Sequence, residues 1–377
     1  MKLFQCQHCG QPLYFENTHC ESCGYALGYL PALETISALE QDGDAWHALA
    51  EPNGRYRYCE NHRYEVCNWL VPAGGDAYCP ACRHNRTIPD LSQAQNLAHW
   101  RKMEIAKHRM FYSLLRLRLP LVTRAEDPEG LAFDFLSDQE SPAPVLTGHE
   151  NGLITINLAE ADDAERERRR GQMGEPYRTL LGHFRHEIAH YYWDRLVAGS
   201  PDIETFRAIF GDERKDYEEA LSEHYAHGAP WDWAQHFITP YATSHPWEDW
   251  AETWAHYFHM VDTLETASAF GLHIRPKLSN GADALTADID FDSYVADLDR
   301  LVTNWLPLTF AVNSINRSMG LSDLYPFVLA PSVIVKLNFI HETIHTAQNR
   351  QQTSGHGGAL RAVAAGLKRK VGAPTHS

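Results

Sequence analysis

Two histidines spaced four residues apart, with a glutamate beside the first, lie near the middle of the chain as His186-Glu187-Ile188-Ala189-His190. On a helix, positions i and i+4 share one face about one turn apart, so both imidazoles can bind one metal ion. This H-E-x-x-H pattern is typical of zinc hydrolases, in which the glutamate takes a proton from an activated water. We therefore expect His186 and His190 to be zinc ligands and Glu187 to be the general base.

The same pattern occurs a second time, at His341-Glu342-Thr343-Ile344-His345. The chain after it contains no Asp or Glu, so no acidic helix can follow, and Gln351 stands where a third histidine would fall. Apolar residues recur around this second motif at the spacing of a helix that packs into a core. We expect it to be structural.

A third zinc ligand is expected from the stretch Ser244 to His259, where Pro246 marks the start of a helix. Glu248, Glu252 and His256 recur every four residues on one face, and large aromatic residues recur on another. Carboxylates buried beside aromatic side chains are costly unless a partner compensates their charge, and a metal ion with its histidines is such a partner. From the residue types alone, either Glu248 or Glu252 can be the third ligand.

These side chains need helices to position them. The helix that carries H-E-x-x-H is expected from about Glu175 to Val197, because Pro176 suits a first turn and apolar residues follow at helical spacing. Asn96 to Leu119 has the same periodicity and predicts a helix that connects two parts of the chain. Leu131 to Leu136 and Gly152 to Leu158 read as strands, the second after a hairpin turn.

Three further segments carry weaker signals. The segment 30–51 is rich in Ala, Leu and acidic residues, and no element is assigned to it. The charged segment 159–174 is expected to be a solvated face or loop. A polar helix is predicted over 212–228, with His224 and His227 on a solvated face or on the wall of a cleft.

All 8 cysteines precede residue 83 and form two groups, both of which end in C-x2-C. Paired knuckles of this kind predict tetrahedral thiolate zinc sites in a reducing compartment, and not disulfides. His62 is a possible replacement for a cysteine in the second group, although four thiolates already complete a tetrahedron. The expected structural zinc ligands are Cys6, Cys9, Cys20 and Cys23 at one site, and Cys59, Cys67, Cys79 and Cys82 at the other.

The composition of the 377-residue chain excludes several classes of partner. A formal net charge of −16 would repel a phosphate backbone, so no nucleic acid is expected. No apolar run reaches the roughly 18 residues that cross a bilayer, and the N-terminus lacks the apolar core of a secretory signal. We expect a cytoplasmic protein without a membrane partner.

The stretch from Ser244 to His259, together with the first H-E-x-x-H motif, resembles the gluzincin branch of the zincin metallopeptidases. In that branch a helix with E-x-x-A-E follows the H-E-x-x-H helix. The resemblance implies that Glu248 is the third zinc ligand and that Glu252 hydrogen-bonds a zinc-binding histidine and fixes its tautomer. It also implies an oxyanion donor upstream of the helix, which is Tyr241 or alternatively His245.

Nearly the whole chain resembles a bacterial family of zinc-binding metallopeptidases with an N-terminal zinc ribbon. The features that carry this resemblance are the two cysteine groups and the stretches H-E-I-A-H-Y-Y-W and H-P-W-E-D-W-A-E-T-W-A-H-Y. That resemblance implies a zincin fold with one catalytic and two structural zinc ions, a peptide or protein substrate, and a ribbon that is structural or binds a protein partner. Two alternatives remain, a non-catalytic zinc-binding scaffold and a zinc amidohydrolase that acts on a non-peptide amide. The expected fold is α+β, with a double zinc ribbon over 1–90, a connecting helix over 91–120, a mostly helical zincin-like domain with a small sheet over 121–350, and a flexible tail over 351–377.

Overall fold

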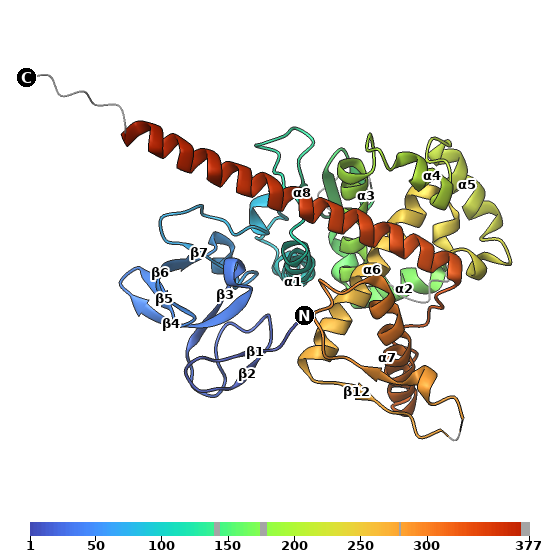
Figure 1. Ribbon diagram of the computed structural model, residues 1–377, viewed down its shortest axis with the longest axis horizontal. Helices are drawn as coiled ribbons and strands as arrows, with labels where there is room; N and C mark the ends of the chain where they lie inside the picture. Colours follow the sequence, from blue (N-terminus) through green and yellow to red (C-terminus); the bar gives the residue numbers. More distant parts are fainter. Residues whose placement is uncertain (139–143, 174–178, 279, 371–377) are drawn as a thin grey trace, which may run out of the picture.

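A computed structural model describes residues 1–138, 144–173, 179–278 and 280–370, with residues 351–370 described by their backbone alone. Strands gather in the N-terminal part, and helices make up most of the rest (Figure 1). The predicted α+β class, with a cysteine-rich ribbon ahead of a helical domain that holds a small sheet, is confirmed. No helix in these described segments is long and apolar enough to cross a membrane.

The ribbon contains a two-stranded and a five-stranded antiparallel sheet. Two of its strands, β4 and β5, lie in the segment 30–51, for which no element was predicted. Residues 36–39 of β4 are all buried, so the strand shows none of the alternation that marks a half-exposed one. The strands are β1 (Phe4–Gln5) and β2 (Pro12–Leu13) in the small sheet, then β3 (Ala26–Leu30), β4 (Thr35–Asp42), β5 (Ala45–Ala48), β6 (Glu51–Tyr58) and β7 (Leu70–Pro72) in sheet order.

Helix α1 (Ala94–Arg116) is the predicted connecting helix, and it is buried on most sides. Trp100, Met103, Met110 and Phe111 have no exposed surface. Figure 1 shows α1 end-on between the ribbon strands and the helices of the C-terminal part. It is therefore the central element of one continuous core that both parts share, and not an exposed linker.

A four-stranded mixed sheet packs beside α1 with the order β10-β11-β9-β8. The predicted hairpin joins β10 to β11, and its turn uses Asn151 and Gly152 at positive φ, 47° and 79°. A Cβ on Gly152 would lie 2.1 Å from the Glu129 carbonyl oxygen, so only glycine fits there. The strands are β8 (Asn85–Thr87), β9 (Ala132–Leu136), β10 (Gly148–Glu150) and β11 (Leu153–Asn157).

The helical part is built mainly on α3 (Leu180–Leu196) and α6 (Pro246–Ala269), which pack along each other. The Thr179 hydroxyl caps α3 by accepting the Gly182 amide, while the expected start at Glu175 lies outside the described residues. The Trp250 indole donates to the Ala189 carbonyl across 2.8 Å. Such contacts fix the register of the two helices that carry the candidate ligands.

The remaining elements complete this part of the chain. The charged segment 159–174 contains helix α2, and the polar helix predicted over 212–228 is shorter, beginning after Asp216. Where a flexible tail was predicted from residue 351, α8 continues to Lys370. The remaining helices and strands are α2 (Asp163–Met173), α4 (Ile203–Phe210), α5 (Tyr217–His227), α7 (Leu298–Ser318), α8 (Pro331–Lys370), β12 (His273–Ile274) and β13 (Ala287–Asp288). The 3-10 turns are η1 (Pro31–Leu33), η2 (Glu60–Tyr64), η3 (Cys82–His84), η4 (Leu158–Ala161), η5 (Trp233–Gln235), η6 (Tyr241–Thr243) and η7 (Asp283–Leu285).

Candidate metal centre and active site

The two histidines of the first H-E-x-x-H motif point toward each other from one face of α3. Their Nε2 atoms are 3.3 Å apart. Two donors on one tetrahedral zinc ion lie about 3.3 Å apart when each bond is about 2.0–2.1 Å. His186 and His190 therefore have the spacing of two ligands of one ion.

Glu248 brings a carboxylate from α6 to the same point. One oxygen, Oε2, lies 2.9 Å from His186 Nε2, and the other, Oε1, lies 3.7 Å from His190 Nε2. His186, His190 and Glu248 form a group whose donor atoms all lie within 4.8 Å of one another. Two imidazoles and one carboxylate are a typical donor set for a catalytic zinc ion, so the residues present fit the metal.

Glu252 occupies the other side of the same imidazole. Its Oε1 accepts a hydrogen bond from His186 Nδ1 across 2.7 Å, and its Oε2 accepts one from the Thr239 hydroxyl, also at 2.7 Å. With Nδ1 protonated, the lone pair of His186 Nε2 faces Glu248 and His190. The two candidate acids thus contact opposite nitrogens of one histidine.

Burial and neighbouring charges shift the pKa values of Glu187 and Glu248 in opposite directions. Burial raises the pKa of Glu187 to about 7, so its carboxylate is a stronger base than an exposed one. Burial also acts to raise the pKa of Glu248, but the neighbouring His190 and His186 outweigh it and lower the pKa to about 2. Glu248 is therefore ionised throughout the physiological range, as a metal ligand must be, while Glu187 can exchange a proton near neutrality.

The two oxyanion candidates lie in different surroundings. The Tyr241 ring lies 6.0 Å from the ring of His186, and burial raises the pKa of its phenol, which keeps the O–H protonated. His245 is the N-cap of α6, where Nδ1 accepts the Trp247 amide at 3.1 Å and Nε2 lies 3.2 Å from the Lys215 carbonyl. Both nitrogens of His245 therefore contact the backbone, which leaves Tyr241 as the oxyanion candidate beside His186.

Tyr217 also reaches the candidate metal centre and was not singled out in the sequence. Its hydroxyl donates to Glu248 Oε1 across 2.6 Å from the first residue of α5. His224, on the same helix, lies within 3.1 Å of the Thr243 hydroxyl, and His227 is exposed. The sequence placed His224 and His227 of this helix on a solvated face or on the wall of a cleft, and it gave Tyr217 no role.

The second H-E-x-x-H motif lies on α8. His341 Nδ1 lies 3.0 Å from the Tyr257 hydroxyl, and burial lowers the pKa of this histidine to about 4. The rings of His341 and His345 are 4.2 Å apart. Within the described residues, these two histidines belong to no group of three metal-binding side chains. The motif lies in the packing of α8 against α6.

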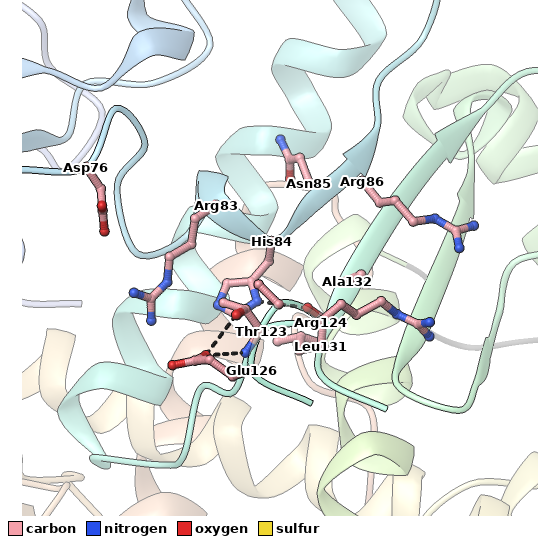
Figure 2. Close-up of a pocket in the computed structure, with 11 residues that line it drawn as sticks. Asp76, Arg83, His84, Asn85, Arg86, Thr123, Arg124, Glu126, Leu131 and Ala132 are labelled. Atoms are coloured by element: carbon pink, nitrogen blue, oxygen red, sulfur yellow. Dashed lines mark hydrogen bonds between the residues drawn. The ribbon is translucent and has the colours of Figure 1, made fainter. Parts of the chain in front are cut away.

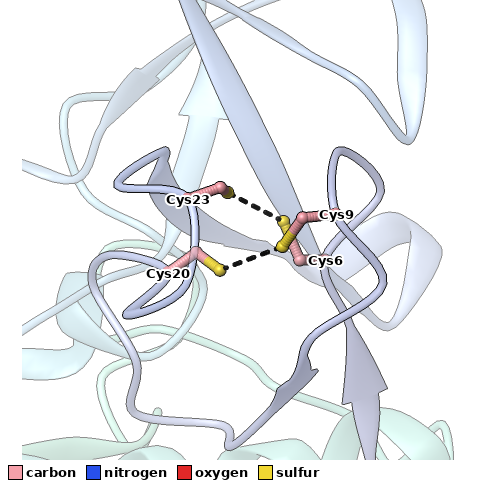
Figure 3. Close-up of side chains that lie close together, drawn as sticks. All are labelled: Cys6, Cys9, Cys20 and Cys23. Carbon is pink, nitrogen blue, oxygen red and sulfur yellow. Dashed lines mark hydrogen bonds between the residues drawn. The ribbon is translucent and has the colours of Figure 1, made fainter.

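The first cysteine quartet converges from two knuckle turns (Figure 3). The sulfurs of Cys6 and Cys23 are 3.7 Å apart and those of Cys9 and Cys20 are 3.6 Å apart. Sulfurs that share one tetrahedral zinc lie about 3.8 Å apart when each bond is about 2.3 Å. All eight cysteines are free of disulfides, and this quartet has the spacing of one zinc site.

The second quartet is completely buried, and its sulfurs lie within 4.8 Å of one another. Cys67 and Cys79 are 3.8 Å apart. His62, the alternative ligand, stacks on Tyr58 and places its Nδ1 2.8 Å from the Cys67 carbonyl, so it joins no metal-binding group of the described residues. A different histidine, His108 of α1, faces the sulfurs instead.

A cavity of about 510 Å³ opens between the ribbon and the mixed sheet (Figure 2). Arg83, Arg86 and Arg124 line it, but Arg86 is bound to Asp134 and Arg124 donates to the Asn151 carbonyl. None of the candidate metal ligands or catalytic residues lines this cavity. It is separate from the candidate active site.

Comparisons with known proteins match two regions of the chain to family models. A family model described as "Putative zinc-binding metallo-peptidase" matches residues 96–343, and one described as "zinc-ribbon domain" matches residues 3–93. Three uncharacterized proteins, from Mycobacterium bovis and from the CDC 1551 and H37Rv strains of Mycobacterium tuberculosis, are each 42% identical over 355 residues, which cover 91% of this chain and 95% of theirs. No solved structure matches the chain.

Proposed function

The chain belongs to the family described as "Putative zinc-binding metallo-peptidase" and carries an N-terminal zinc ribbon, and from this premise we propose that it hydrolyses peptide bonds in a peptide or protein substrate. The observation that supports this most directly is the group of His186, His190 and Glu248, with Glu187 beside it. In this proposal the three side chains hold zinc in the manner of a gluzincin, and Glu252 orients His186.

Each of these residues has a defined part in the proposed reaction. Bound zinc lowers the pKa of a coordinated water to about 7 and polarises a carbonyl. Glu187 accepts a proton from the attacking water and passes it to the leaving amine, which a carboxyl with a pKa of about 7 can do at neutral pH. Tyr241 donates its O–H to the developing oxyanion, and burial keeps that phenol protonated.

The ribbon is proposed to hold two further zinc ions in structural sites and to serve as a structural or partner-binding module. Four protein ligands leave no open position for a substrate, so such sites stabilise a fold and do not catalyse. Eight free cysteines suit a reducing compartment, for which we propose the cytoplasm. The charge of −16 supports a protein partner over a nucleic acid.

Metal content and hydrolysis together test the proposal. The purified protein should contain close to three zinc ions per chain, and incubation with a mixed peptide library should produce new termini detectable by mass spectrometry. Two zinc ions per chain would contradict the catalytic site and leave a zinc-binding scaffold. Three zinc ions without any peptide cleavage would contradict the peptidase and favour hydrolysis of another amide.

A further inference from the structure

Two further metal-binding side chains, Glu104 and His108 of α1, lie at the second cysteine cluster and form a group with Cys82. The side chain of His108 is almost completely buried. Its Nε2 lies 3.2 Å from Cys67 Sγ, 3.8 Å from Cys79 Sγ and 3.6 Å from Cys82 Sγ. The described contacts include none between His108 and Cys59, the remaining cysteine of the cluster.

These distances are those of a tetrahedral zinc site with three sulfurs and one nitrogen. Bond lengths of about 2.3 Å to sulfur and 2.0–2.1 Å to nitrogen separate sulfur from nitrogen by about 3.5 Å and sulfur from sulfur by about 3.8 Å. Cys67 and Cys79 are 3.8 Å apart, and the three distances from His108 lie on both sides of the expected value. These four distances are therefore compatible with a zinc ion bound to Nε2 and the sulfurs of Cys67, Cys79 and Cys82.

The other nitrogen of His108 determines which tautomer faces the cluster. Nδ1 lies 2.6 Å from the Glu104 carbonyl, and a carbonyl oxygen only accepts, so Nδ1 carries a proton. In the neutral ring, the Nε2 lone pair then points at three sulfurs, which is unfavourable beside thiolates unless a cation lies between them. Zinc-binding histidines almost always donate the other ring N–H to a carbonyl or carboxylate, as His108 does.

We propose that the zinc ion of the second cluster is held by Cys67, Cys79, Cys82 and His108, and that Cys59 lies beside the ion without coordinating it. Cys59 and His108 both approach the triangle of the other three sulfurs, and a four-coordinate ion binds only one of them. The proposal rests on zinc binding by the ribbon and is independent of peptidase activity.

Residues around His108 hold it in this position. Glu104 and Lys107 are fully buried and form an ion pair at 2.8 Å, and the same Glu104 oxygen accepts from Asn85 at 2.7 Å and from Trp100 at 3.1 Å. Transfer of two charges from water to the interior costs free energy, so the Glu104–Lys107 pair adds little to the stability of the fold. It does fix the helical turn whose carbonyl orients His108.

The site would connect two parts of the chain. His108 lies within the residues matched by the metallopeptidase family, whereas the zinc-ribbon match ends at residue 93. The same helix packs against α3, which carries His186 and His190. A ribbon zinc ion coordinated by His108 would therefore link the ribbon to α1, which packs against the helix of the candidate active site.

Cadmium-113 NMR of the full-length protein, with cadmium replacing zinc, tests the proposal because each site gives its own resonance. The resonance moves upfield for each thiolate that nitrogen replaces, so the wild-type spectrum needs no variant for its interpretation. We expect one resonance at the all-thiolate position, one at the position for three thiolates and one nitrogen, and one far upfield from the catalytic site. Two all-thiolate resonances would overturn the assignment of His108 as a ligand.

Three variants sharpen the assignment. In His108→Ala, the second resonance should move to the all-thiolate position as Cys59 replaces the imidazole, or disappear. In Cys59→Ser it should keep its position, whereas its loss would overturn the proposal. His62→Ala is the matched control, because His62 also lies beside Cys67 but contacts only the backbone carbonyl, and all three resonances should be unchanged.

Discussion

Glu252 accepts a hydrogen bond from His186 Nδ1 across 2.7 Å, so this imidazole can offer only its Nε2 atom to a metal ion. Glu248 lies on the Nε2 side, at 2.9 Å. Glu248 and Glu252 lie one helical turn apart, and their replacement should therefore affect zinc binding differently. Glu248→Ala should remove the catalytic zinc and lower the metal content by one ion per chain. Glu252→Ala should keep the ion but weaken its binding by about 10- to 100-fold.

Metal analysis after dialysis and a competition titration with a chelator measure these two effects. Glu223→Ala, on α5, is the control for losing a carboxylate near the site, since Glu223 is exposed and belongs to no metal-binding group of the described chain. Loss of the ion in Glu252→Ala alone would reverse the two roles.

Replacing the proposed base should separate metal binding from catalysis. Glu187→Gln keeps the shape of the side chain but cannot accept a proton, so hydrolysis should fall by about 100- to 10,000-fold with zinc content unchanged. The second H-E-x-x-H motif offers a matched control, since Glu342→Gln makes the same change beside a histidine pair without a third ligand. Full activity in Glu187→Gln, measured with a cleaved library peptide, would show that another group is the base.

Two tyrosines near the candidate centre should respond differently to loss of the hydroxyl. Tyr241→Phe should lower kcat by about 100- to 1,000-fold with little change in KM, because an oxyanion donor acts in the transition state. Tyr217→Phe removes the 2.6 Å bond to Glu248 and should change zinc affinity more than kcat. Tyr225→Phe is the control, since that side chain is 65% exposed on the same helix as Tyr217. A normal kcat in Tyr241→Phe would exclude Tyr241 as the donor.

A buried ion pair joins α6 to α8, between Asp249 and Lys336 at 2.7 Å. Lys336→Met leaves the carboxylate unpaired in the interior and should lower the free energy of unfolding by about 3–5 kcal/mol at pH 8. Burial raises the pKa of Asp249 to about 7 even with Lys336 beside it, so protonation should reduce this loss at pH 6. The solvated pair of Arg317 and Asp323 supplies the comparison, because Arg317→Ala should lower the free energy of unfolding much less than Lys336→Met does. Urea denaturation at pH 6 and pH 8 measures the free energy of unfolding of each variant. Equal decreases for the two ion pairs would show that burial of the Asp249–Lys336 pair does not matter.

Acid should weaken the fold through histidines that are buried without charge. Burial lowers the pKa of His256 to about 4, from 6.5 in an unfolded chain. As pH falls from 6.5 to 4, the unfolded chain binds a proton that the folded chain does not, so the free energy of unfolding decreases. The loss should reach about 3 kcal/mol for His256, which the variant His256→Gln should not show. The exposed His227→Gln should retain the wild-type pH dependence. Comparison of zinc-loaded variants at each pH separates this effect from metal release, and identical curves for wild type and His256→Gln would contradict it.

Local patterns in the sequence predicted the main parts of the fold and the candidate site. The H-E-x-x-H spacing and the cysteine knuckles act over a few residues, so they are readable without knowledge of the fold. The existence of α3 and α6 followed from helical periodicity, and the distinction between the two H-E-x-x-H motifs followed from the acids near Glu248. The structure brings Glu248 and Glu252 to His186, whereas in the described part of the chain no third metal-binding side chain joins His341 and His345.

The features that the sequence did not reveal depend on contacts between distant segments. His108 lies 26 residues after Cys82, at a position that helical periodicity alone marks only as part of α1. Tyr217 reaches Glu248 from 31 residues away, through the start of α5. Strand β4 is buried on both faces, so the alternation that would have identified it is absent. Single-sequence patterns do not contain this information, because tertiary packing creates it.

Helices α3 and α6 are joined at three successive levels: Trp250 to the Ala189 carbonyl, Glu252 to His186, and Asp262 to Arg185. Sliding one helix past the other would break all three contacts together. These contacts therefore fix the relative positions of the proposed zinc ligands on α3 and α6. The proposed ligands should therefore hold cobalt or cadmium in the same arrangement. Loss of a more distant contact between the two helices, such as that of Asp262 with Arg185, should first weaken metal binding.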